Sequence, residues 1–135
     1  MRIILATIGS LGDLHPVIAL AIELRQRGHA VTIATSANYR EKLAALELPF
    51  HPLRPDLLAG GSQVIAEIMG GTDGTKRLIR DRIFPAVRDM YDDLDEIASG
   101  ADVIVGSELV CAAPILAATR GVRWVSHFLA PVSLF

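Results

Sequence analysis

The stretch that decides the fold is MRIILATIGSLGDLHP, residues 1–16. Residues 2–8 form a continuous apolar and β-branched run, which predicts a strand buried on both faces. Gly9 and Gly12 permit a tight turn after it. Pro16 predicts a helix that has this proline in its first turn. The chain therefore begins with a strand, a tight loop and a helix, the first unit of an α/β fold.

The rest of the chain continues this alternation of strands and helices. Further strands are predicted at 30–35, 102–106 and 124–128, and a short edge strand at 48–53, where two prolines weaken the ladder. A long amphipathic helix is predicted at 76–98, kinked or split at Pro85. Such alternation predicts right-handed crossovers and a Rossmann-like, doubly wound parallel sheet.

Composition narrows the class of protein. The 135 residues are 51% hydrophobic and 5% aromatic, which suits one domain with an aliphatic core. A net charge of −2, with mixed signs along the chain, argues against a nucleic-acid partner. The lone Cys111 excludes an internal disulfide and leaves no zinc pattern, so we expect no metal site and a cytoplasmic protein. No apolar run is long enough to span a bilayer, and peripheral membrane contact stays open.

The loop after the first strand is the main candidate for a ligand site. In doubly wound sheets ligands bind outside the carboxyl ends of the strands, where this loop lies. Its spacing is GxxG and not GxGxxG, and Thr35, Ser36 and Asn38 stand where an acidic residue would bind a ribose. A dinucleotide site is therefore disfavoured.

Residues 1–35 resemble the amino terminus of GT-B glycosyltransferases of the UDP-glycosyltransferase superfamily. The similar groups are the sterol and lipid glucosyltransferases and the bacterial enzymes that glycosylate antibiotic aglycones. The residues that carry the resemblance are Gly9, Ser10, Gly12, Asp13, Pro16, Gly28, His29 and Val31. A weaker resemblance continues through residues 101–126. The variable region 54–97 lies outside it.

The resemblance implies that Asp13, three residues before Pro16, deprotonates or orients the acceptor hydroxyl. The structural alternative is that Asp13 only caps the following helix. Ser10 and Gly12 would contact the donor diphosphate, or else serve only the turn.

Three other residues are candidates for the acceptor cleft: His15, Glu108 and His127. His15 does not match the family position and could line the cleft or replace Asp13 as base. Glu108 could hydrogen-bond in the cleft or serve as an acid at a helix start. His127 could face the acceptor or be a core or rim histidine.

The resemblance further implies that residues 1–135 are an N-terminal acceptor-binding domain. The enzyme would transfer a hexose from a nucleotide diphosphate sugar, its co-substrate, to a hydroxyl of a lipid-like or polycyclic acceptor, without metal or other cofactor. The donor would bind a C-terminal domain, in cis or in trans, so we expect this chain alone to be inactive. The alternative is a stand-alone flavodoxin-like module that binds a ligand without catalysis. Apolar residues of the glycine-rich region 54–75 could line an acceptor pocket or only cover the sheet: Leu57, Leu58, Ile65, Ile68 and Met69. We expect this region to be the most mobile.

Overall fold

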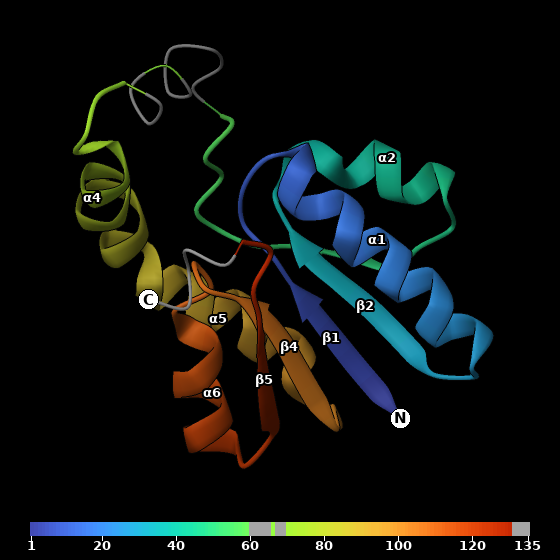
Figure 1. Cartoon of the computed structure of the whole chain (residues 1–135). Coiled ribbons are helices and arrows are strands. Elements are labelled where there is room, and N and C mark those ends of the chain that lie inside the picture. Colours follow the sequence, from blue (N-terminus) through green and yellow to red (C-terminus); the bar gives the residue numbers. More distant parts are fainter. Residues whose placement is uncertain (60–65, 67–69, 131–135) are drawn as a thin grey trace.

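A five-stranded parallel sheet forms the centre of the molecule (Figure 1). The computed structural model describes residues 1–59, 66 and 70–130. The strands are β1 (Arg2–Ala6), β2 (Ala30–Thr35), β3 (Phe50–Pro52), β4 (Val103–Ser107) and β5 (Arg123–His127). They lie in the order β3-β2-β1-β4-β5, and every neighbouring pair is parallel. The predicted parallel sheet is confirmed, with β3 as a short strand at one edge.

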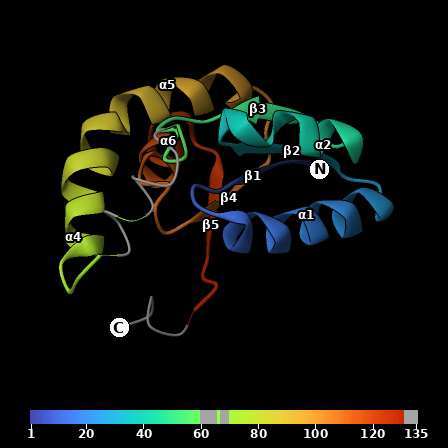
Figure 2. The same ribbon diagram turned by 90° about the horizontal axis from the view of Figure 1, so that it is seen from above.

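Helices cover both faces of this sheet. They are α1 (Leu11–Gln26), α2 (Arg40–Ala45), α4 (Gly74–Leu78), α5 (Val87–Ala98) and α6 (Ala112–Arg120). Seen from above, α1 lies on one side of the strands, and α5 and α6 lie on the other (Figure 2). The doubly wound arrangement expected from the sequence is therefore present.

Each face of the sheet has its own aliphatic core. Under α1 and α2, side chains such as Leu5, Leu14 and Ile33 are almost fully buried. Under α5 and α6, the same holds for Met90 and Leu116. Alternate residues of each strand point to opposite faces, so a strand with both faces covered is apolar throughout. This explains the continuous apolar run of β1.

The start of α1 corrects one expectation. The helix begins at Leu11, so Pro16 lies inside it and not in its first turn. Ser10 caps the helix, and its hydroxyl oxygen accepts a hydrogen bond from the N–H of Gly12. This cap starts the helix earlier than the proline suggested, so that Pro16 is the sixth residue of α1. Pro16 is accommodated there without the N–H that would bond to the Gly12 carbonyl.

The long predicted helix is broken as expected. After α4 come a π-helical turn (Ile79–Ile83) and a 3-10 turn (Phe84–Ala86), and α5 follows. Pro85 lies in the 3-10 turn, where its missing N–H and its ring disrupt the regular hydrogen bonding. Arg54 ties α5 to the end of β3, since its guanidinium donates to the buried carboxylate of Asp93 at 2.7 Å.

The variable region is described only in part. Residues 60–65 and 67–69, which include Ile65, Ile68 and Met69, lie outside the described residues. The expected mobility of this stretch stays a prediction. Leu57 is buried in the core under α5, and Leu58 packs against the core under α1. These two leucines therefore cover the sheet. Within the described part of the chain, no helix is long and apolar enough to cross a membrane.

Candidate functional site at the carboxyl edge of the sheet

The order of the strands creates a switch point between β1 and β4. From β1 the chain crosses to β2 on one side, and from β4 it crosses to β5 on the other. The loops after β1 and β4 therefore diverge, and open α/β sheets bind ligands outside the carboxyl edge at such a point, a region called the crevice. Asp13 follows the first of these loops, and Glu108 lies in the second.

Ser10 and Asp13 form a reciprocal cap at the start of α1. The carboxylate Oδ2 of Asp13 accepts from the Ser10 N–H at 2.7 Å and from the Ser10 hydroxyl at 3.1 Å. Both bonds converge on Oδ2, and Oδ1 makes no hydrogen bond within the described part of the chain. The capping role expected as the alternative for Asp13 is thus present, with one carboxylate oxygen anchored and the other open.

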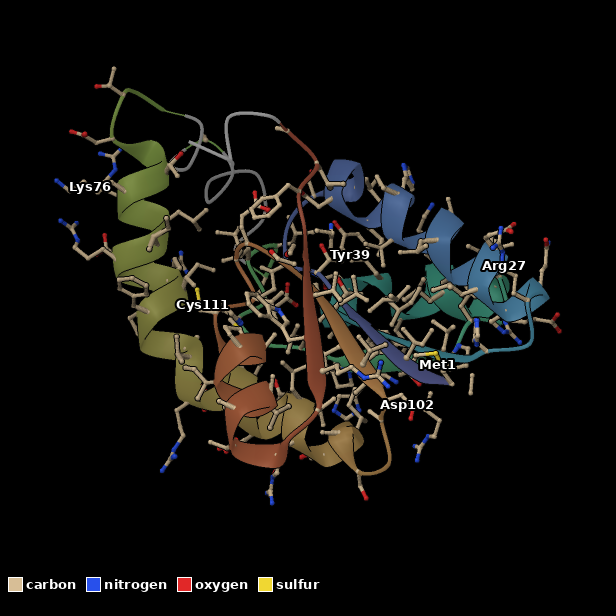
Figure 3. The ribbon with its side chains drawn as sticks, turned by 60° about the horizontal axis from the view of Figure 1, so that its bottom comes forward. Met1, Arg27, Tyr39, Lys76, Asp102 and Cys111 are labelled. Atoms are coloured by element: carbon tan, nitrogen blue, oxygen red, sulfur yellow. The ribbon has the colours of Figure 1, made fainter. Side chains whose placement is uncertain are left out.

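Gly9 allows this carboxylate to approach the loop. Its φ is +144°, and a Cβ at this position would overlap the carboxylate of Asp13. Any larger residue would therefore move Asp13 or distort the loop. The carbonyl of Gly9 accepts a hydrogen bond at 3.1 Å from the hydroxyl of Tyr39, which lies at the opposite end of the strands from Met1 and Asp102 (Figure 3).

Tyr39 is buried beside two acidic residues, and sequence reasoning did not single it out. Burial, and then the negative charges of Asp13 and Asp56, raise the pKa of its phenol. Tyr39 therefore stays a neutral hydrogen-bond donor to the loop at neutral pH. Its ring belongs to the core under α1 and α2, so it links that core to the crevice.

Asp56 is the second residue that sequence reasoning missed. Its Oδ1 accepts from the Ser36 hydroxyl at 2.6 Å, the Asn38 side-chain amide at 3.2 Å and the Leu58 N–H at 3.2 Å. These bonds join the loop after β2 to the loop after β3 and fix the side of the crevice near β3. An acidic residue shortly after a short strand is the only signal in the sequence that could have indicated it.

The other predicted residues lie along the same edge. His15 is on the first turns of α1 and is exposed, and Glu108 is exposed in the turn between β4 and α6. His127 ends β5 and is half-buried, and its Nε2 is buried without a hydrogen-bond partner in the part of the chain described. Asp13, Ser10 and Gly12 form one hydrogen-bonded cluster. No described group of three His, Cys, Asp or Glu side chains could hold a metal ion.

Comparisons with known proteins agree with this architecture. The model of the glycosyltransferase family 28 N-terminal domain matches residues 3–120. A vancomycin aglycone glucosyltransferase from Amycolatopsis orientalis is 31% identical over 129 residues, which are 96% of this chain and 28% of that relative. A sterol 3-beta-glucosyltransferase from Arabidopsis thaliana is 40% identical over 62 residues, which are 44% of this chain and 10% of that relative.

Solved structures share the fold. The Streptomyces sp. SF2575 glycosyltransferase SsfS6 superposes with a TM-score of 0.65 at 25% identity, over 93% of this chain and 38% of that one. The calicheamicin glycosyltransferase CalG4 gives a TM-score of 0.70 at 19% identity, over 93% of this chain and 31% of that one. The chain therefore corresponds to about a third of these longer proteins.

Proposed function

The chain belongs to the glycosyltransferase family 28 N-terminal domain family, and on that premise we propose that it is the acceptor-binding half of a glycosyltransferase. The proposed reaction moves a hexose from a nucleotide diphosphate sugar to a hydroxyl of a lipid-like or polycyclic acceptor. The names of the relatives, which act on an antibiotic aglycone and on sterols, support this acceptor class. A stand-alone binding module without catalysis is the less favoured alternative.

We propose that a second domain, in cis or in trans, binds the donor. The chain spans 28% and 29% of the length of the first two curated relatives, so most of each relative lies outside the matched region. SsfS6 has been solved with thymidine diphosphate, which supports a nucleotide diphosphate sugar as the donor class here. Closure of the two domains over the crevice would exclude water from the reaction.

The observation that carries the proposed mechanism is the half-anchored carboxylate of Asp13. Oδ2 is held by Ser10, so the open Oδ1 has a fixed position from which to accept the proton of an acceptor hydroxyl. The acceptor oxygen then bonds to the anomeric carbon of the sugar, and the bond from that carbon to the diphosphate oxygen breaks. The proton remains on Asp13, and the nucleoside diphosphate leaves with the electron pair.

The other residues of the edge have supporting roles in this proposal. Ser10 and Gly12 lie at the positive end of the α1 dipole, where a donor diphosphate would be stabilised. His15, Glu108 and His127 would line the acceptor side. Tyr39 would hold the loop that precedes α1 and Asp13, through its bond to Gly9.

The experiment that tests the proposal compares the isolated chain with the same domain joined to its donor-binding domain. The joined protein should transfer sugar to a hydroxylated aglycone or sterol, and the isolated chain should not. If the isolated chain turned over a sugar nucleotide at about 1 per second or faster, a rate typical of enzymes, the half-enzyme proposal would be wrong.

We also propose peripheral contact of the helical arm 74–88 with anionic lipid. This arm holds five basic residues and one acidic residue, in a chain whose net charge is −2. Phe84 is 62% exposed on it, and Lys76 points away from the body of the molecule (Figure 3). Basic residues beside an exposed aromatic ring suit the interface of an anionic bilayer. The free thiol of Cys111 is consistent with a cytoplasmic location, which we also propose.

A further inference from the structure

Polar side chains from four neighbouring segments lie at the same level of the carboxyl edge; three are the last residues of their strands, and Thr7 directly follows β1. We call them the edge row; in the order β2-β1-β4-β5 they are Thr35, Thr7, Ser107 and His127. Ala6 pairs with Ala34 and with Gly106, so the residues that follow these three, Thr7, Thr35 and Ser107, are also level. Ser107 pairs directly with His127. Four segments that are distant in the sequence therefore meet in one line.

The edge row faces the α1 side of the sheet. Side chains two residues apart in a strand share a face. Leu5, Ile33 and Val105 lie two residues before members of the row, and all three belong to or pack against the core under α1 and α2. The row is thus the polar end of that apolar face.

The polar side-chain atoms of the edge row have no hydrogen-bond partner among the residues that the structure describes. Thr7 Oγ1, Thr35 Oγ1, Ser107 Oγ and His127 Nε2 are buried and make no hydrogen bond within the described residues, and both threonines are only 1% exposed. Leaving a buried polar group unpaired costs about 1–3 kcal/mol, and folded proteins keep few such groups. Neighbouring strands are about 4.8 Å apart, so an oxygen atom placed between two members can bond to both.

A pocket of about 140 Å³ lies at the His127 end of the row. Its lining residues are Leu5, Pro16, Val17, Leu20, Val105, His127 and Leu129. Among these described residues, all but His127 are apolar, and none carries a fixed charge. An apolar cavity of about 150 Å³ can hold benzene, so this pocket matches one six-membered ring. Leu20 and Leu129 are exposed, which leaves the pocket open to a longer ligand.

We propose that this pocket binds a ring of a neutral, hydroxylated apolar ligand, and that His127 hydrogen-bonds its hydroxyl together with Ser107, which is not among the lining residues but lies beside His127 in the sheet. A hydroxyl both donates and accepts, so it can serve the Ser107 hydroxyl and either tautomer of His127. A charged ligand would find no counter-charge among the lining residues. The proposal that this ligand is the acceptor rests on the proposed function, and the rest of the inference does not. If the ligand is the acceptor, the pocket holds a part of it other than the hydroxyl that reacts at Asp13.

Phenol and toluene test the proposal, because they have the same ring and differ only by hydroxyl against methyl. Binding to the isotope-labelled chain is followed by nuclear magnetic resonance, with the imidazole nitrogens of His127 as the reporter. We expect phenol to bind at least fivefold more tightly than toluene and to shift the Nε2 resonance of His127. Toluene should shift the pocket methyl groups alone.

Two variants assign the hydroxyl contact. His127→Phe and Ser107→Ala should remove the preference for phenol while keeping the affinity for toluene, and Ser107→Ala should not lower the melting temperature of the free chain. His51→Phe, on β3 at the opposite edge of the sheet, is the matched control and should keep the preference. Equal affinity for the two ligands, or no binding of either by the wild-type chain, would overturn the proposal. No sugar transfer is measured, so this result is independent of the test of Asp13.

Discussion

Replacing Asp13 with asparagine separates its two roles, helix cap and base. Asparagine keeps the shape of the side chain and an oxygen that can accept from the Ser10 N–H, which now bonds to Oδ2 at 2.7 Å. The change removes the negative charge near the start of α1, which is worth about 0.5–1 kcal/mol. That loss should lower the melting temperature by about 2–6 °C.

The expected loss of activity is far larger than this loss of stability. A general base contributes about 100- to 10,000-fold to the rate, which corresponds to about 3–5.5 kcal/mol of activation free energy. A domain of ordinary stability, about 5–15 kcal/mol, stays almost fully folded after losing 1 kcal/mol. Unfolding therefore cannot imitate the loss of a base, and initial rates with thermal melting of the joined two-domain protein distinguish the roles.

Two controls accompany this variant. Asp95→Asn makes the same chemical change at a carboxylate paired with Arg120, near the amino end of the strands, and should leave the rate unchanged. His15→Gln should cost much less rate than Asp13→Asn. An Asp13→Asn protein that melts early but keeps its turnover would show that Asp13 is only a cap. A His15→Gln protein that stays folded and loses turnover would move the base to His15.

Arg54→Met should lower stability by about 1–2 kcal/mol at pH 7, less than for a fully buried pair because Arg54 is half-exposed. Burial opposes ionisation of Asp93, but the hydrogen bonds from Arg54 hold the pKa of this carboxyl below its usual value. The stabilisation by the pair is therefore present above about pH 4, and it is lost as the pH falls through the lowered pKa. Thermal melts should show a large difference from wild type at pH 7 and a small one near pH 2; equal differences would contradict the assignment. Binding to vesicles that contain anionic lipid can be measured by sedimentation, and Phe84→Ser and Arg82→Glu should each weaken it several-fold. Lys42→Glu on α2 makes the same charge change as Arg82→Glu and should have little effect. Equal losses from these two charge changes would indicate a response to net charge alone.

Much of the fold could be predicted because the signals are local. Strands with both faces covered leave continuous apolar runs, as in β1 and β4. A proline well inside a long helical pattern removes an N–H and disrupts the regular hydrogen bonding, as at Pro85. The start of α1 was predicted wrongly, since Pro16 suits the first turn of a helix, whereas Ser10 and Asp13 cap one that starts earlier, at Leu11. Asp13 lies three positions after Ser10, which suits a reciprocal cap.

The candidate site was less predictable because its contacts depend on register. Tyr39 reaches Gly9, and Asp56 reaches Ser36, across loops that only the folded sheet brings together. The edge row is even harder to predict from the sequence. The predicted strand at 2–8 ends at Ala6 in the structure, and a shift of one residue would turn a side chain to the opposite face. Strand boundaries read from sequence are not accurate enough to place such a row.

The parallel register of this sheet also determines how the ligand preference of the edge row could change. Each of four chain segments supplies one position of the edge row, and the ladder of backbone hydrogen bonds, not the side chains, sets their spacing. The side chain at one position can therefore be substituted while the side chains at the other positions keep their places. A new pattern of hydroxyl and methyl groups along the row needs only single substitutions and no rebuilding of the aliphatic core. Selection, or an engineer, could in this way retune which ligand hydroxyl is recognised one strand at a time.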